Sequence, residues 1–210
     1  MKTLFIDICG VAASGKDLFF NLLKRELDER GIPAHKYSLA DSLKEEVNGY
    51  LKEHYQIDIF NCTRREKDSV RPFLVFHGSM KRAESEGRHW IEILDKKISE
   101  ENLTGVVCVT DIRYDEFEGD EVDWVKDELG GVLVHIKREG IKPANKEETK
   151  QDPSLINKSN YKIEWPTLQG CQKDIESQLI KQYITKFADW LLNDHGLILS
   201  EQSKRERLSK

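Results

Sequence analysis

The chain has 210 residues and a net charge of −5, and 38% of its residues are hydrophobic and 34% are charged. This size and composition predict a single α/β domain over 1–210, large enough for one core and an inserted lid. The negative charge argues against nucleic-acid partners, because generic binding to nucleic acids needs a basic surface. No apolar stretch approaches the length of a membrane span, and no signal peptide is found. We therefore expect a cytoplasmic protein without a membrane partner.

The cysteines are widely spaced and form no C-x-x-C pair; they are Cys9, Cys62, Cys108 and Cys171. This spacing favours reduced packing residues over a disulfide or a zinc site.

The first motif is a small-residue loop between a predicted strand at residues 4–8 and an amphipathic helix at 17–30. Its two glycines are separated by four residues and followed by a lysine, which is the phosphate-binding pattern. Small residues let successive N–H groups converge on phosphate oxygens, and the following helix adds its positive N-terminus. The expected phosphate-binding residues are Gly10, Ala12, Ala13, Ser14, Gly15, Lys16 and Asp17.

Asp17 departs from the usual pattern, which has Ser or Thr after the lysine. A carboxylate can hold magnesium directly or through water, so Asp17 favours a metal-neutralised nucleotide over a bare anion. The alternative is a strand-to-helix turn that binds nothing.

The next elements are a strand at 34–39 and a helix from Asp41 or Ser42 to about residue 55. The carboxyl end of a parallel strand faces the ligand crevice in this class of fold, which places 38–44 beside the phosphates. Lys44 is then a candidate anion contact, or simply an exposed helix lysine.

A connection at 56–70 is expected before a helical region at 71–98 that is rich in cations and interrupted by Gly78 and Gly87. Grouped arginines suit phosphate because a planar guanidinium takes two oxygens at once. The cations that predict a phosphate-binding wall are Arg71, Lys81, Arg82 and Arg88.

Two further apolar runs predict buried parallel strands at 106–110 and 132–136. The first delivers Asp111 and Arg113 at its carboxyl end, and the second delivers Lys137 and Arg138. Asp111 can orient magnesium-bound water or a substrate hydroxyl, and Arg113 can clamp a phosphate. A surface ion pair between Asp111 and Arg113 is the alternative.

The remaining segments are an acidic helix at 114–129, a polar stretch at 140–157, a strand at 161–165, a closing helix at 175–192 and a charged tail at 200–210. The polar stretch lacks hydrophobic periodicity, which indicates either a mobile lid or a long surface loop.

Five motifs together resemble a known family: GVAASGKD, YSLADSLKEEV, RPFLVFHGSMKRAESEGRHW, VTDIRYDEFE and GGVLVHIKRE. In order and spacing they are similar to the deoxynucleoside monophosphate kinases of bacteriophages, over residues 1–157. The aspartate after the loop lysine is informative, because that family also has it. Animal-type phosphomevalonate kinases share the GKD loop, the turn before LKE and the D-x-R strand end, and are the close alternative.

The resemblance implies an α/β P-loop NTPase fold of the adenylate-kinase-like type, a parallel sheet flanked by helices. It implies an acceptor-binding region at about 40–98 and a lid at about 138–157. The reaction it implies is magnesium-dependent transfer of the γ-phosphoryl group of ATP to a nucleoside or deoxynucleoside 5′-monophosphate.

The resemblance also implies residue roles. The expected catalytic residues are Lys16, Asp111, Arg113 and Arg138, the expected metal-binding residues are Asp17 and Asp111, and the expected acceptor-binding residues are Lys44, Arg71, Arg82 and Arg88. The chain departs from the family in being shorter between 55 and 71 and in having lysines but no arginine at 140–157.

Two other functions stay open: a kinase of another phosphorylated metabolite such as phosphomevalonate, and an ATP-binding module without catalysis. The aromatic residues of the acceptor region lean slightly toward a nucleobase, although aromatics at helical spacing usually form core; they are Tyr50, Tyr55, Phe73, Phe76, His77 and Trp90. Either a monomer or a homodimer is compatible with the sequence.

Overall fold

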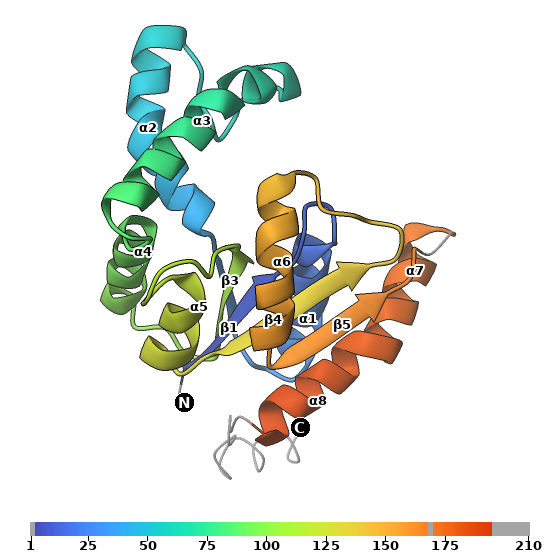
Figure 1. Ribbon diagram of the computed structural model, residues 1–210. Coiled ribbons are helices and arrows are strands. Elements are labelled where there is room, and N and C mark those ends of the chain that lie inside the picture. Colours follow the sequence, from blue (N-terminus) through green and yellow to red (C-terminus); the bar gives the residue numbers. More distant parts are fainter. Residues whose placement is uncertain (1–2, 168–169, 195–210) are drawn as a thin grey trace.

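The computed structural model describes residues 3–167 and 170–194. Within them, one parallel sheet has the strand order β2-β3-β1-β4-β5 (Figure 1). The strands are β1 Leu4–Cys9, β2 Ala34–Tyr37, β3 Val106–Ile112, β4 Val132–Arg138 and β5 Tyr161–Trp165. In register, Ile6 of β1 lies opposite Cys108 of β3 and Val132 of β4. Because the strands are parallel, the loops after β1, β3 and β4 emerge at one edge of the sheet.

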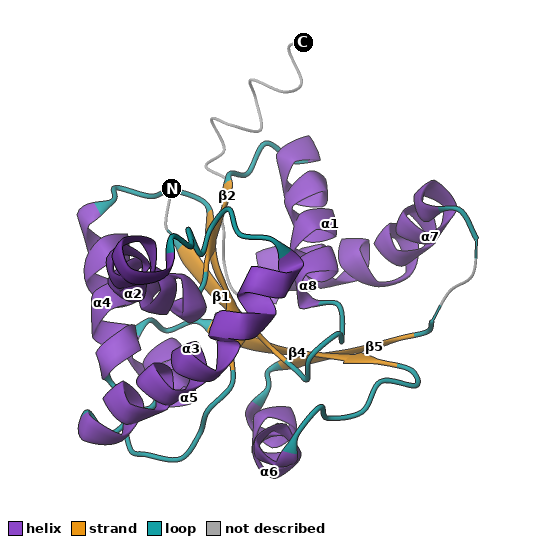
Figure 2. Ribbon diagram, turned by 90° about the horizontal axis from the view of Figure 1, so that it is seen from above, coloured by secondary structure: helices purple, strands orange, loops and turns teal. Residues whose placement is uncertain are grey.

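The helices form a layer on each side of this sheet. They are α1 Lys16–Glu29, α2 Leu39–Tyr55, α3 Arg64–Glu84, α4 His89–Glu100, α5 Glu121–Asp123, α6 Lys146–Lys158, α7 Gln172–Leu179 and α8 Thr185–Asp194, with π-helical turns at Trp124–Glu128 and Ile180–Ile184. Seen from above, α1, α7 and α8 lie on one side of the sheet and α4, α5 and α6 on the other (Figure 2). Helices α2 and α3 project beyond the sheet, and we call residues 39–84 the arm (Figure 1). No helix in the described part of the chain is long and apolar enough to cross a membrane.

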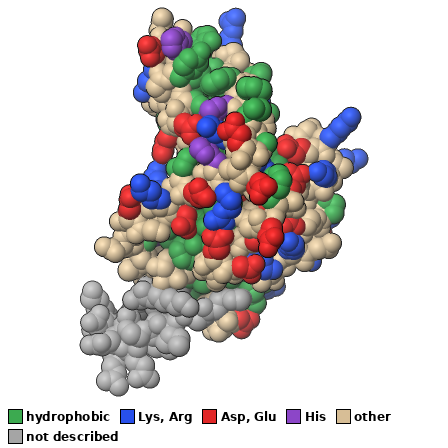
Figure 3. Space-filling view, turned by 60° about the vertical axis from the view of Figure 1, so that its left-hand side comes forward, with side chains coloured by type: hydrophobic (Ala, Val, Ile, Leu, Met, Phe, Trp, Pro, Cys, Tyr) green, Lys and Arg blue, Asp and Glu red, His purple; other side chains and the backbone are tan. Residues whose placement is uncertain are grey.

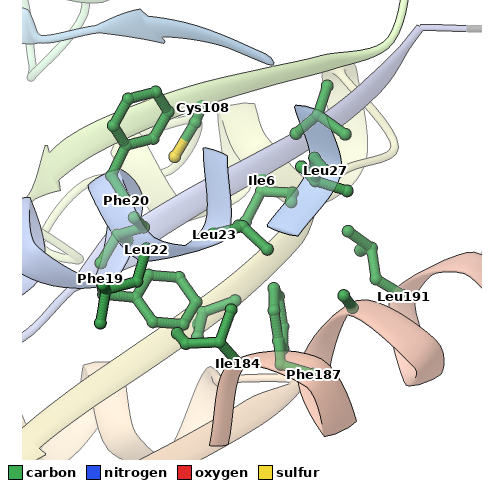
Figure 4. Packing of buried hydrophobic residues seen from close by; sticks show 14 of the residues in the cluster. Ile6, Phe19, Phe20, Leu22, Leu23, Leu27, Cys108, Ile184, Phe187 and Leu191 are labelled. Carbon is green, nitrogen blue, oxygen red and sulfur yellow. The ribbon is translucent and has the colours of Figure 1, made fainter. Parts of the chain in front are cut away.

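Successive side chains along each strand point to opposite faces of the sheet, so the hydrophobic core has one part on each face. Ile6 and Ile8 of β1 pack with Phe19 and Leu23 of α1 and with Phe187 of α8 (Figure 4). The opposite face of the sheet packs against α4, α6 and the segment around α5. A third, smaller cluster holds the arm together.

The predicted strands are confirmed, except that the strand predicted at 34–39 ends at Tyr37 because α2 begins at Leu39, and three helical predictions need correction. Residues 56–70 are not all connection, since α3 already begins at Arg64 behind a capping box in which Thr63 and Glu66 exchange hydrogen bonds. Residues 71–98 are not one helical region, because the chain breaks before α4 at Gly87, whose φ is +91°. The segment 114–129 is helical only from Glu121.

The polar stretch 140–157 is not simply a long loop, because α6 occupies most of it. The side chain of Asn145 caps this helix by accepting the N–H of Glu148 at 2.8 Å. The predicted charged tail, 200–210, lies outside the described residues.

Candidate active site

The loop at residues 10–16 is a tight turn pressed against neighbouring strands. Gly10 and Gly15 have φ of +131° and +97°, and a Cβ on Gly10 would lie 2.3 Å from the carbonyl oxygen of Ile136. The indole of Trp165 donates to the carbonyl of Ser14 at 2.9 Å and leaves no room for a side chain on Gly15. Both glycines are therefore required by the geometry, as a phosphate-binding loop demands.

Lys16 folds back over this loop. Its Nζ donates to the carbonyls of Gly10 at 2.6 Å and Val11 at 2.9 Å. Burial lowers the pKa of Lys16 and the neighbouring charge of Arg113 lowers it further, while the charge of Glu148 opposes this shift. The ammonium thus lies at the loop with a second cation close by.

Arg113 and Arg138 follow the strands on either side of β1. Within residues 3–167 and 170–194, neither guanidinium makes a hydrogen bond or an ion pair, whereas Lys137 beside Arg138 pairs with Glu164 at 2.7 Å. The backbone N–H of Arg113 is fixed by the Glu121 carboxylate at 2.6 Å. Arg113 in particular presents an unpaired cation near Lys16.

Asp111 lies at the carboxyl end of β3, as expected, but its partners were not predicted. Its carboxylate accepts the N–H groups of Leu39 at 2.8 Å and Ala40 at 2.9 Å and the hydroxyl of Ser38 at 2.9 Å. A carboxylate at a helix N-terminus is stabilising, so Asp111 anchors α2 to the sheet. Three hydrogen bonds to its two oxygens disfavour direct metal binding by Asp111, and its expected contact to magnesium through water stays a prediction.

Asp17 is the remaining candidate for magnesium. Its side chain is 78% exposed at the start of α1, and Oδ1 accepts from Lys36 at 2.5 Å. Oδ2 has no partner among the described residues. The same residues contain no group of three or more His, Cys, Asp or Glu that could hold a metal. One free carboxylate oxygen fits an ion that keeps most of its waters and binds chiefly to phosphates.

Arg82 is a correction to the expected acceptor site. It is buried, and its guanidinium pairs with both carboxylate oxygens of Asp120 and covers the ring of Tyr114 at 3.8 Å. Burial alone would raise the pKa of Asp120, but the hydrogen bonds from Arg82 hold it below its usual value. The guanidinium supports the segment before α5 and is not free for a phosphate.

Arg88 is similarly engaged. It donates to both carboxylate oxygens of Glu128 and, at 2.7 Å, to the carbonyl of Gly119. Arg88 thus holds α4 to the region of α5, but its pair with Glu128 is as exposed as the pair of Lys44 with Asp41, so the expected acceptor contact of Arg88 stays a prediction.

Lys44 and Arg71 are the other two acceptor candidates, and both also stay partly available. Lys44 donates to Asp41 at 2.5 Å within α2. Arg71 is 60% exposed on α3, and its closest acid is Asp68 at 3.8 Å. Exposed pairs of this kind are weak and exchange readily with another anion.

The aromatic residues of the arm are partly packed and partly exposed: Tyr50, Tyr55 and Phe76 are 48%, 59% and 63% exposed. Phe73 stacks between Tyr50, at 5.8 Å between ring centroids, and His77, at 6.0 Å. His77 and His89 both bind the Glu46 carboxylate, at 2.7 and 2.9 Å, and histidine and acidic side chains adjoin on this face of the arm (Figure 3). Phe73 and His77 are therefore occupied by packing, whereas Tyr50, Tyr55 and Phe76 keep exposed ring surface.

Two acidic residues near the site were missed by sequence reasoning. Asp7 lies in β1 with no exposed surface, where the sequence pattern reads as a simple buried strand. Glu148 of α6 accepts the backbone N–H of Ala12 in the loop at 3.1 Å. The spacing of Asn145 and Glu148, a capping pattern, was the available signal for the start of α6.

Together the sheet order and the loop define an α/β P-loop protein of the adenylate-kinase-like type, as expected. No protein-family model and no curated protein matches the sequence.

Among solved structures, shikimate kinase from Acinetobacter baumannii in complex with shikimate is similar, with a TM-score of 0.45 and 13% identity over 88% of this chain and 95% of that chain. Shikimate kinase from Bacteroides thetaiotaomicron is similar with a TM-score of 0.47 and 12% identity over 90% of this chain and 98% of that chain. These similarities concern the arrangement of strands and helices and carry no inference about the substrate.

Proposed function

We propose that the protein is a phosphotransferase that transfers the γ-phosphoryl group of ATP to a nucleoside or deoxynucleoside 5′-monophosphate. The observation that carries this proposal is the unpaired state of Arg113 and Arg138, on the two strands beside the loop that ends in Lys16. Phosphoryl transfer needs cations around the transferring group more than it needs a protein nucleophile. A loop with two unpaired arginines beside it meets that need.

Each residue has a defined part in this proposal. The loop N–H groups and Lys16 hold the donor phosphates. Arg113 neutralises charge between donor and acceptor, and Arg138 approaches from the side of α6. Asp17 would help to hold magnesium, which would supply charge neutralisation to the phosphates when bound.

The arm is the proposed site of the acceptor. Asp111 fixes the N-terminus of α2 beside the loop, so the helix dipole and the N–H groups of α2 are held in a defined place. Lys44 and Arg71 are the proposed acceptor-phosphate contacts on the arm. The resemblance of the sequence motifs favours a nucleoside monophosphate as the acceptor.

A second kinase function, with phosphomevalonate or another phosphorylated metabolite as acceptor, uses the same donor site. The stacking of Phe73 between Tyr50 and His77 removes one aromatic ring from those that the sequence offers to a nucleobase, which supports this alternative. An ATP-binding module without catalysis would leave Arg113 and Arg138 without a function.

The test is a phosphotransfer assay that follows ADP release with ATP and magnesium, offering the common NMPs, the dNMPs and phosphomevalonate separately. Lys16→Ala and Arg138→Ala should each lower kcat by about 100-fold, the usual cost of a lost transition-state contact. Lys137→Ala is the matched control, since Lys137 pairs with Glu164, and it should change kcat less than about twofold.

Several outcomes would contradict the proposal. Turnover with phosphomevalonate alone would show that the acceptor is phosphomevalonate and not a nucleotide. ATP binding without turnover would favour the ATP-binding module without catalysis. Equal effects of Arg138→Ala and Lys137→Ala would remove Arg138 from the site.

A further inference from the structure

The first turn of α6 places a carboxylate against the phosphate-binding loop. Glu148 accepts the N–H of Ala12 through Oε1 at 3.1 Å and the N–H of Ala144 through Oε2 at 2.8 Å. Burial lowers the pKa of Lys16, and the negative charge of Glu148 is among the charges that oppose this shift. The Glu148 carboxylate therefore occupies the N–H of Ala12, one of the hydrogen-bond donors of the loop, and its negative charge acts on Lys16.

The two halves of α6 are attached to the molecule differently. In the C-terminal half, Leu155 is buried, and at the centre of the helix Asp152 binds the buried His135 at 2.9 Å. Most of the first turn is exposed. Pro153 lies inside the helix and has no N–H for the carbonyl of Thr149, which weakens the helix between the halves. The first turn is therefore held less firmly than the second half, chiefly by the exposed pair of Lys150 with Glu116 and the contact of Glu147 with Tyr114.

We propose that Glu148 competes with the phosphates of the donor nucleotide for the loop and must leave Ala12 when the nucleotide binds. This inference rests on the proposed function. A carboxylate and a polyphosphate repel each other at close range, and the polyphosphate carries more charge and more acceptor oxygens for the loop. Glu148 thus weakens donor binding and couples the first turn of α6 to it.

The experiment measures binding of ADP and of pyrophosphate by calorimetry to the full chain, without an acceptor. Glu148→Gln keeps the shape of the side chain and removes its charge. The matched control is Glu147→Gln, which removes the same charge from the same turn, where Glu147 contacts Tyr114 and not the loop. Pyrophosphate has no base or sugar, so a change in its affinity reports on the phosphate site alone.

We expect Glu148→Gln to lower the Kd of both ligands about fivefold or more, within the range of typical coupling energies, while Glu147→Gln stays within about twofold. In the unliganded protein, Glu148→Ala should speed amide hydrogen exchange in the peptide that contains Ala12, and Glu147→Ala should not.

Equal tightening by both Gln variants would overturn the proposal, since it would show a general charge effect. An unchanged or higher Kd in Glu148→Gln would also overturn it. If neither the wild type nor any variant binds ADP or pyrophosphate, both this inference and the proposed function are contradicted. Binding without phosphotransfer to any acceptor contradicts only the proposed function.

Discussion

Asp7 is an ionisable residue in the middle of the sheet. It has no exposed surface, and neither of its carboxylate oxygens has a hydrogen-bond partner. Burial raises the pKa of Asp7 well above its usual value, and the negative charge of Asp111 adds to this shift. A raised folded-state pKa stabilises the protein fully below the unfolded-state pKa, and this contribution is lost as pH rises through the folded-state pKa.

We therefore expect Asp7→Asn to become more stable relative to the wild type as pH rises. The relative gain should be on the order of 1 kcal/mol per pH unit between the unfolded-state and the folded-state pKa of Asp7, which is the linkage slope of one proton. Urea unfolding at a series of pH values measures this difference, with the exposed Glu118→Gln as the control. A wild-type-to-variant difference that is constant between about pH 5 and pH 8 would show that Asp7 is ionised in both states there and that burial does not raise its pKa.

At the residue scale, the sequence identifies the loop but not the partners of most charged side chains. The local pattern of residues 10–16 is sufficient because its chemistry is made by neighbouring backbone groups. Arg82 and Asp120 are 38 positions apart, and an arginine on a polar helix face has the same sequence pattern whether it binds a phosphate or a carboxylate. Arg113 was predicted because it directly follows a strand, where the fold itself fixes its location.

At the scale of elements, Arg82 joins α3 to the segment before α5. Asp120 has no exposed surface, and the nearby Glu121 is almost as deeply buried. Burial raises the pKa of Glu121 to about 8, against the lowering effect of the Arg113 N–H and the Arg82 charge. Removing the guanidinium would leave these acids without their compensating charge.

Arg82→Met should therefore cost about 3–5 kcal/mol in the free energy of unfolding, the usual result of breaking a buried ion pair. Arg64→Met, in the same helix, is the control, because its side chain is 83% exposed and its pair with Asp68 contributes about 1 kcal/mol or less. Urea denaturation measures both values. Similar losses for the two variants would mean that the buried network contributes no more than a surface pair.

The elements themselves were predictable to different degrees. Buried parallel strands stand out as β-branched runs, so β3 and β4 were located from composition alone. The start of α3 and the whole of α6 depend on capping by Thr63 and Asn145 within polar sequence, where hydrophobic periodicity gives no signal. The capping residues therefore set where these helices begin, in sequence where the hydrophobic pattern does not.

At the scale of the whole molecule, the arm has a core separate from the sheet. Val47, Leu51, Ile59 and Val70 are its buried residues, whereas the cluster between the sheet and α1 contains many more. Segments with few buried apolar contacts open locally at a lower free energy than the whole protein. The arm should therefore exchange its amide hydrogens faster than β1 and β3.

Two leucines with equally small exposure, 1% each, test this division: Leu51 in the arm and Leu23 in α1. Each Leu→Ala change should lower the free energy of unfolding of the part that contains it by about 2–5 kcal/mol. Leu51→Ala should speed hydrogen exchange within the arm and leave β1 and β3 protected, while Leu23→Ala should speed exchange throughout the sheet. In the proposed kinase, Leu51→Ala should raise the acceptor KM and leave the Kd of ADP unchanged, since the loop belongs to the larger core. Matching exchange profiles for the two variants would show instead that arm and sheet unfold as one unit.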